Sequence, residues 1–170
     1  MDVVATLVAP CPPAALFAWV DDLGQYPEWL EIVARAEPVG DGSWAVDLRG
    51  RLGPLARSKR LRMVRSPLPN GSAVASSAAD PVERISTSPG PGGSAAAMSV
   101  RFERAELDGR NHSPWVLEAE VAAHAEGSEL HMGLHYGGAL FGPVLERLLR
   151  DEIERSRLRL LALASKPAGA

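Results

Sequence analysis

Several features that would assign the chain to a particular class of protein are scarce or missing. Only one of its 170 residues, Cys11, is a cysteine, so the chain cannot form an internal disulfide. No apolar run approaches the roughly 20 residues needed to cross a bilayer, and the N-terminus lacks the basic and apolar segments of a signal peptide. We therefore expect no membrane span and a cytoplasmic protein.

The chain also lacks an excess of positive charge. Its 18 Lys and Arg residues are outnumbered by 21 Asp and Glu residues, which gives a formal net charge of -3. Domains that bind nucleic acid are normally basic, because they must neutralise phosphates. We expect no nucleic-acid partner.

Motifs for a metal, a cofactor or a nucleophile are missing as well. His131 and His135 share one face of a predicted strand, but four residues along a strand span about 13 Å. No Cys or carboxylate spacing is typical of a zinc site. Cys11 stands between prolines, with no histidine at a recognisable offset. We predict neither a metal nor a cofactor.

What the sequence does contain is a series of alternating segments. The alternation is clearest in residues 43–52, where Trp44, Val46 and Leu48 are separated by polar or small residues. A period of two predicts half-buried strands of an antiparallel sheet. The predicted strands cover residues 2–9, 34–39, 43–52, 58–65, 98–107, 112–123 and 129–136.

Three helices are predicted, two of them short. The short ones cover residues 12–20 and 26–33, directly after the first strand, and the long one covers residues 140–164. In the long segment, apolar residues recur every three or four positions and form one stripe. Residues 66–97 are mostly Ser, Ala, Gly and Pro, and this composition predicts a low-complexity, mobile insertion. The prediction is one domain of residues 1–165, followed by a flexible tail of residues 166–170.

This order of elements predicts an α+β fold of the helix-grip kind. A curved antiparallel sheet would wrap around the long C-terminal helix, with the two short helices following the first strand. A helix with its side chains is only about 10–12 Å wide, so it covers part of a wide sheet. We therefore expect a cavity at one end of the covered face.

Four runs of the sequence carry a family resemblance. They are LFAWVDDLGQYPEWL, GRLGPLARSKRLRM, VRFERAELDGR and LHYGGALFGPVLERLL. Together with the element order they resemble the superfamily that groups START lipid-transfer domains, birch-pollen-allergen-like proteins, and aromatic polyketide cyclases and dehydrases (SRPBCC). The resemblance covers nearly the whole chain outside residues 66–97 and the tail. It implies a deep hydrophobic pocket, but none of the runs is a catalytic motif, and one fold hosts many functions.

The inward-facing apolar residues are the predicted lining of that pocket. Ligand sites are mostly apolar, although for any single one of these residues plain core packing is the more common role. The predicted ligand-binding residues are Trp29, Trp44, Leu48, Met63, Phe102, Trp115, Leu117, Met132, Leu134, Tyr136, Phe141 and Leu145.

Two polar residues are weak candidates for chemistry. Arg104 and Glu106 share the strand face of Phe102. Arg104 would bind a ligand oxygen there or form a structural ion pair at the open end of the sheet, unless a β-bulge turns it to the other face. Tyr136 ends an inward-facing strand. It would either donate a hydrogen bond or a proton to a ligand, or serve as an aromatic plug with its hydroxyl at the surface.

Three functions follow from this pattern. The first is a carrier or sensor of a hydrophobic small molecule, such as a lipid or polyketide. The second is an aromatic polyketide cyclase or dehydrase that acts without a cofactor, through Arg104 and Tyr136. The third is a protein-interaction module whose cavity is filled. The sequence is compatible with a monomer or a homodimer.

Overall fold

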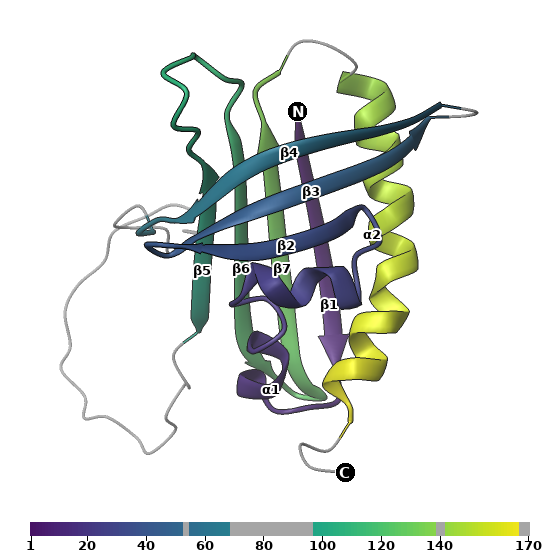
Figure 1. Cartoon of the computed structure of the whole chain (residues 1–170). Coiled ribbons are helices and arrows are strands. Elements are labelled where there is room, and N and C mark those ends of the chain that lie inside the picture. The colour runs from purple at the N-terminus through teal and green to yellow at the C-terminus, as the bar shows by residue number, and fades with distance from the viewer. Residues whose placement is uncertain (53–54, 69–96, 139–141, 167–170) are drawn as a thin grey trace, which may run out of the picture.

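A computed structural model of the chain describes residues 1–52, 55–68, 97–138 and 142–166 (Figure 1). Most of the predicted insertion and most of the predicted tail lie outside these ranges. The elements are β1 (Asp2–Ala9), α1 (Pro13–Phe17), η1 (Leu23–Glu28), β2 (Val33–Gly40), β3 (Ser43–Leu52), β4 (Leu55–Arg65), β5 (Met98–Arg104), β6 (Trp115–His124), β7 (Gly127–Tyr136) and α2 (Gly142–Ala164).

The seven strands form one antiparallel sheet in the order β1-β7-β6-β5-β4-β3-β2. The sheet is strongly curved, so that β2, β3 and β4 cross in front of the other strands in Figure 1. Helix α2 lies along β1, at the other end of the strand order from β2. The predicted α+β helix-grip fold is confirmed.

The chain turns sharply between β2 and β3 because two residues adopt positive φ. Asp41 has φ 51° and Gly42 has φ 64°. Both residue types tolerate this conformation, and two such residues match the right-handed twist of the flanking strands. The hairpin turn predicted at this dipeptide is confirmed.

The second short helix was predicted in the wrong place. The structure has a 3-10 helix at Leu23–Glu28, whereas residues 26–33 were expected to be helical. The Asp22 side chain accepts a hydrogen bond from the Gly24 N–H at 2.8 Å and starts the helix earlier. Val33 instead begins β2 and pairs with Leu48.

Other element ends also differ from the prediction. Helix α1 covers only Pro13–Phe17 of the expected residues 12–20, and β5 ends at Arg104, three residues before Leu107. Strand β6 begins at Trp115 rather than His112, directly after Pro114, which has no N–H to donate to a neighbouring strand. The connection between β5 and β6 is therefore longer than expected.

The core lies between the concave face of the sheet and the helices. Phe102 and Val121 are completely buried on β5 and β6, and Leu16 and Tyr26 are buried from the side of α1 and η1. On the outer face, by contrast, Val4 of β1 is 74% exposed. Burial therefore distinguishes valines that lie on opposite faces of the same sheet.

We expect Val121→Ala to lower the free energy of unfolding by about 2 kcal/mol, because it leaves a small cavity in a packed region. Val4→Ala makes the same change on the outer face and should cost about 0.5 kcal/mol or less. Urea unfolding of the two variants measures the difference. Equal losses would contradict the assignment of the buried face.

Candidate functional site

Two apolar cavities lie between the sheet and α2. The β1 cavity has a volume of about 80 Å³ and lies where α2 faces β1 and β7. Its lining is Val3, Ala5, Thr6, Leu7, Trp29, Leu30, Leu117, Leu130, Met132, Gly133, Leu134, Leu149, Ile153, Ser156, Arg157 and Leu160. The β3 cavity has a volume of about 70 Å³. Its lining is Leu23, Tyr26, Leu30, Ile32, Val33, Val46, Leu48, Leu61, Met63, Trp115, Leu117, Leu134 and Leu149.

The two cavities share four lining residues, all of them leucines. Leu30, Leu117, Leu134 and Leu149 belong to both linings, and we call them the leucine wall. They come from the segment after η1, from two neighbouring strands and from α2. Displacing these side chains would join the cavities into one space.

Several of the few polar side chains in the two linings are paired within the protein. Ser156 donates from Oγ to the Ile153 carbonyl oxygen at 2.9 Å, and Arg157 forms an ion pair with Glu154 at 3.1 Å. The Tyr26 hydroxyl donates to the Val20 carbonyl oxygen at 3.1 Å, and burial raises its pKa far above the usual value. The cavities therefore present a surface suited to apolar molecules.

The run from Asp22 to Trp29 fixes one end of both cavities. Besides capping η1, Asp22 accepts a hydrogen bond from the Trp44 indole N–H at 3.0 Å. The Trp29 indole N–H donates to the Trp19 carbonyl oxygen at 3.2 Å, and its ring packs 4.8 Å from that of Tyr26. These contacts place Trp29 and Leu30 against the cavities.

A buried carboxylate ties the segment after η1 to α2. Glu152 is only 5% exposed. Its carboxylate accepts a hydrogen bond from the Glu31 backbone N–H at 2.8 Å and forms an ion pair with Arg155 at 2.9 Å. The Glu31 carboxylate in turn pairs with Arg159, about two helical turns beyond Glu152 on α2. Because Leu30 precedes Glu31 directly, this clamp holds part of the leucine wall against the helix.

We expect Glu152→Gln to weaken the clamp, because a charge-assisted acceptor becomes a neutral one. The free energy of unfolding should fall by about 1–2 kcal/mol, and the Glu31 amide should exchange with solvent faster. Glu154→Gln, on the same helix but exposed, serves as the control and should change little. Urea unfolding and hydrogen exchange measure both effects. The same outcome in both variants would contradict the clamp.

The structure distributes the predicted ligand-binding residues over three groups. Seven of them line at least one cavity: Trp29, Leu48, Met63, Trp115, Leu117, Met132 and Leu134. Trp44, Phe102 and Tyr136 lie outside both linings; Phe102 is fully buried, and Trp44 packs edge-on against it at 5.4 Å. Phe141 lies outside the described residues, as does the Leu145 side chain. That any of these residues contacts a ligand stays a prediction.

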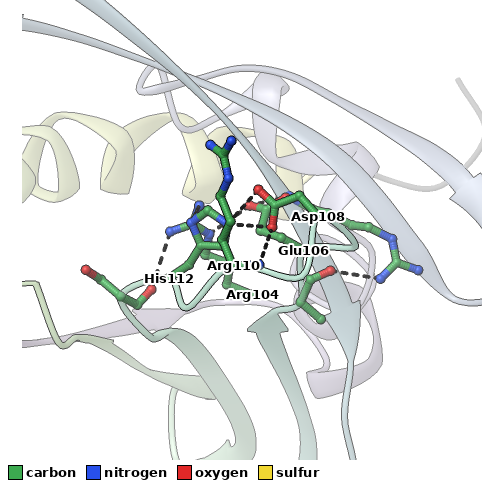
Figure 2. A network of polar contacts seen from close by, with 8 residues as sticks. Arg104, Glu106, Asp108, Arg110 and His112 are labelled. Carbon is green, nitrogen blue, oxygen red and sulfur yellow. Dashed lines mark hydrogen bonds and ion pairs between the residues drawn. The ribbon is translucent and has the colours of Figure 1, made fainter.

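Arg104 is held in a polar network rather than directed into a cavity (Figure 2). Its side chain is 8% exposed and donates from Nε to Glu106 at 2.7 Å. Its Nη2 lies 3.0 Å from His112 Nδ1, and the other ring nitrogen of His112 lies 2.8 Å from Asp108. The ion pair with Glu106, one of the two roles considered for Arg104, is thus present.

Tyr136 lies beside this network, at the same end of the sheet. Its ring packs against that of Trp115, the residue directly opposite on β6, with 5.2 Å between centroids. A Cβ atom on Gly138 would lie 2.0 Å from the Tyr136 hydroxyl, so glycine is required for the ring to occupy this position. Neither Tyr136 nor Arg104 belongs to the linings of the two cavities.

Sequence reasoning missed much of the lining. Val3, Ala5 and Leu7 of β1 were not selected, although they alternate with outward residues. Leu149, Ile153 and Leu160 were placed in the apolar stripe of the long helix but not in the pocket. The alternation and the stripe were therefore sufficient signals for these residues. Leu30 and Ile32 carry no such signal, because they lie in an irregular segment.

Neither a metal-binding cluster nor a membrane-spanning helix is found among the described residues. No group of three or more His, Cys, Asp and Glu side chains is arranged to hold a metal ion within the described ranges. In the same part of the chain, no helix is both long enough and apolar enough to cross a membrane.

Comparison with solved structures identifies the fold. A START superfamily protein from Mycobacterium smegmatis superposes with a TM-score of 0.60 at 12% identity, over 95% of this chain and 94% of that one. The structure of Ara h 8.0201 gives a TM-score of 0.51 at 14% identity, over 96% and 95% of the two chains. These matches confirm the predicted START-like and birch-pollen-allergen-like fold.

A third match has a chain about twice as long. The di-domain ARO/CYC BexL from the BE-7585A biosynthetic pathway superposes with a TM-score of 0.55 at 12% identity, over 99% of this chain and 51% of that one. No protein-family model matches the sequence, and no curated protein matches it. At these identities the structural matches establish the fold alone.

Proposed function

We propose that the protein binds a hydrophobic small molecule between the sheet and α2, as a carrier or sensor of a lipid, a polyketide or a similar compound. The observation that supports this most directly is the pair of apolar cavities that share the leucine wall. The linings are mostly apolar and several of their polar groups are paired within the protein, so most of the binding energy would come from burial of apolar ligand surface. Such burial contributes about 25 cal/mol per Å² before the costs of ordering.

The ligand is expected to move the leucine wall. At about 80 Å³ and 70 Å³, each cavity is smaller than the roughly 300–1,000 Å³ typical of small-molecule sites. A ligand that fills both must push the wall side chains apart or lift the segment after η1 from α2. The Glu152 clamp opposes the second movement, because it holds Leu30 in place. Uptake would therefore require a transient opening of this clamp.

The second candidate function is that of an aromatic polyketide cyclase or dehydrase, and the structural match to a di-domain ARO/CYC protein is the observation that favours it. An enzyme of this kind needs polar groups that converge on the bound substrate. Arg104 is instead occupied by Glu106 and His112, and Tyr136 lies outside both linings. The geometry therefore supports binding better than catalysis.

Titration with the neutral fluorescent probe N-phenyl-1-naphthylamine tests the proposal. We expect saturable binding by the wild-type protein and a loss of at least about tenfold in affinity for Leu134→Trp, which fills space on both sides of the wall. Ala5→Leu is a milder variant that fills only the β1 cavity and should weaken binding less.

Val4→Trp is the matched control, because it adds the same indole to the exposed outer face of the sheet. It should leave the affinity for the probe unchanged, and circular dichroism should show that all three variants are folded. A wild-type protein that does not take up the probe would contradict the proposal and favour the interaction module with a filled core. Equal losses in Leu134→Trp and Val4→Trp would contradict the location of the site.

A further inference from the structure

The rim of the β3 cavity carries a positive charge that the proposed function has not used. Lys59 lies on β4 and shares its strand face with Leu61 and Met63, which both line this cavity. Its register partner on β3 is Leu48, another lining residue. Side chains that face each other across antiparallel strands are about 4.5–5.5 Å apart at Cβ. Lys59 therefore adjoins the cavity on its concave side.

Two more polar residues border the same cavity through their register partners. Arg104 pairs with Met63, and Tyr136 pairs with Trp115. The Lys59 ammonium lies over the Tyr136 ring, 5.9 Å from its centroid, so the three polar side chains gather at one edge. We call these three side chains, together with Glu106, the ion-pair partner of Arg104, the polar rim.

Lys59 differs from the other charged members of the rim in its partners. Arg104 and Glu106 neutralise each other at 2.7 Å, and Arg104 also contacts His112. Among the residues that the structure describes, Lys59 forms no ion pair, and a large part of its surface is exposed to solvent although the rest is covered. Partial burial and the positive charge of Arg104 lower the pKa of the Lys59 ammonium, and an anion placed there would act in the opposite direction.

We propose that Lys59 binds the carboxylate of an amphipathic ligand whose apolar part occupies the cavities behind the leucine wall. This inference rests on the proposed function, because it needs a ligand in the cavities, and it adds the chemical class of that ligand. A molecule with a carboxylate at one end and a hydrocarbon body at the other fits the arrangement. Its charge would stay at the exposed rim, where it is cheaply solvated, while its body is buried.

Two ligands with the same twelve-carbon chain separate the head group from the tail. Dodecanoate carries the carboxylate and 1-dodecanol does not, and displacement of N-phenyl-1-naphthylamine measures both affinities. We expect Lys59→Gln to lower the affinity for dodecanoate by about tenfold, which is the effect of losing one charge-assisted hydrogen bond. The affinity for 1-dodecanol and for the probe should stay within about twofold, because the apolar cavities are unchanged.

Arg60→Gln is the matched control. Arg60 is the next residue on β4 but points to the outer face, where it pairs with Asp47 at 2.7 Å. The Arg60→Gln substitution removes the same formal charge from the protein and should leave the affinities for dodecanoate and 1-dodecanol unchanged. The proposed role of Lys59 is wrong if Lys59→Gln and Arg60→Gln lower the affinity for dodecanoate equally. It is also wrong if neither variant lowers this affinity while the probe still binds. In both cases the proposed cavity site stands. If the wild-type protein binds none of the three molecules, both proposals are overturned.

Discussion

The structure depends on one geometric mismatch. A seven-stranded antiparallel sheet presents an apolar concave face that is wider than the helix available to cover it. Curvature brings β2, β3 and β4 across the open side, and η1 closes one end, but the space is not completely filled. What is left is the pair of cavities on either side of Leu30, Leu117, Leu134 and Leu149. The proposed site is therefore a consequence of the way in which the sheet is covered.

The same mismatch explains where charge is found. The covered face is dry, so charged side chains on it must be paired or must lie at its edge. Glu152 follows the first rule, because its buried carboxylate accepts from a backbone N–H and from Arg155. Arg104 follows it through Glu106 and His112. Lys59 instead lies at the edge, on the polar rim, without an ion-pair partner among the described residues. Its position therefore suggests that the partner is an anionic group of a ligand.

Much of the fold could be predicted from the sequence because the signals are local. Alternation in β3 and the hairpin at Asp41-Gly42 depend on neighbouring residues, and both were predicted at the correct positions. The limits of η1 could not be predicted in this way. Asp22 both caps η1 and holds the indole of Trp44, 22 residues away, so the start of the helix depends on a tertiary contact.

The candidate site was less predictable than the fold. The parity of a strand residue says which face it lies on, but not whether it contacts a neighbour or an empty space. Phe102 and Leu117 both face inward, yet only Leu117 lines a cavity. Lys59 shares the parity of Leu61 and could have been noticed, but its exposure beside Tyr136 depends on the curvature of the sheet. The volume of a cavity and the residues at its rim depend on how side chains pack, and sequence periodicity does not specify this packing.

Methyl NMR spectroscopy of the leucines tests most directly whether ligand binds at the leucine wall. The protein, labelled at leucine methyl groups, would be titrated with N-phenyl-1-naphthylamine. The account predicts that the signals of Leu117, Leu134 and Leu149 shift with a common saturation curve, while those of the exposed Leu107 and Leu158 do not move. Shifts confined to exposed leucines, or unchanged signals from the wall under conditions where the probe is bound, would contradict it.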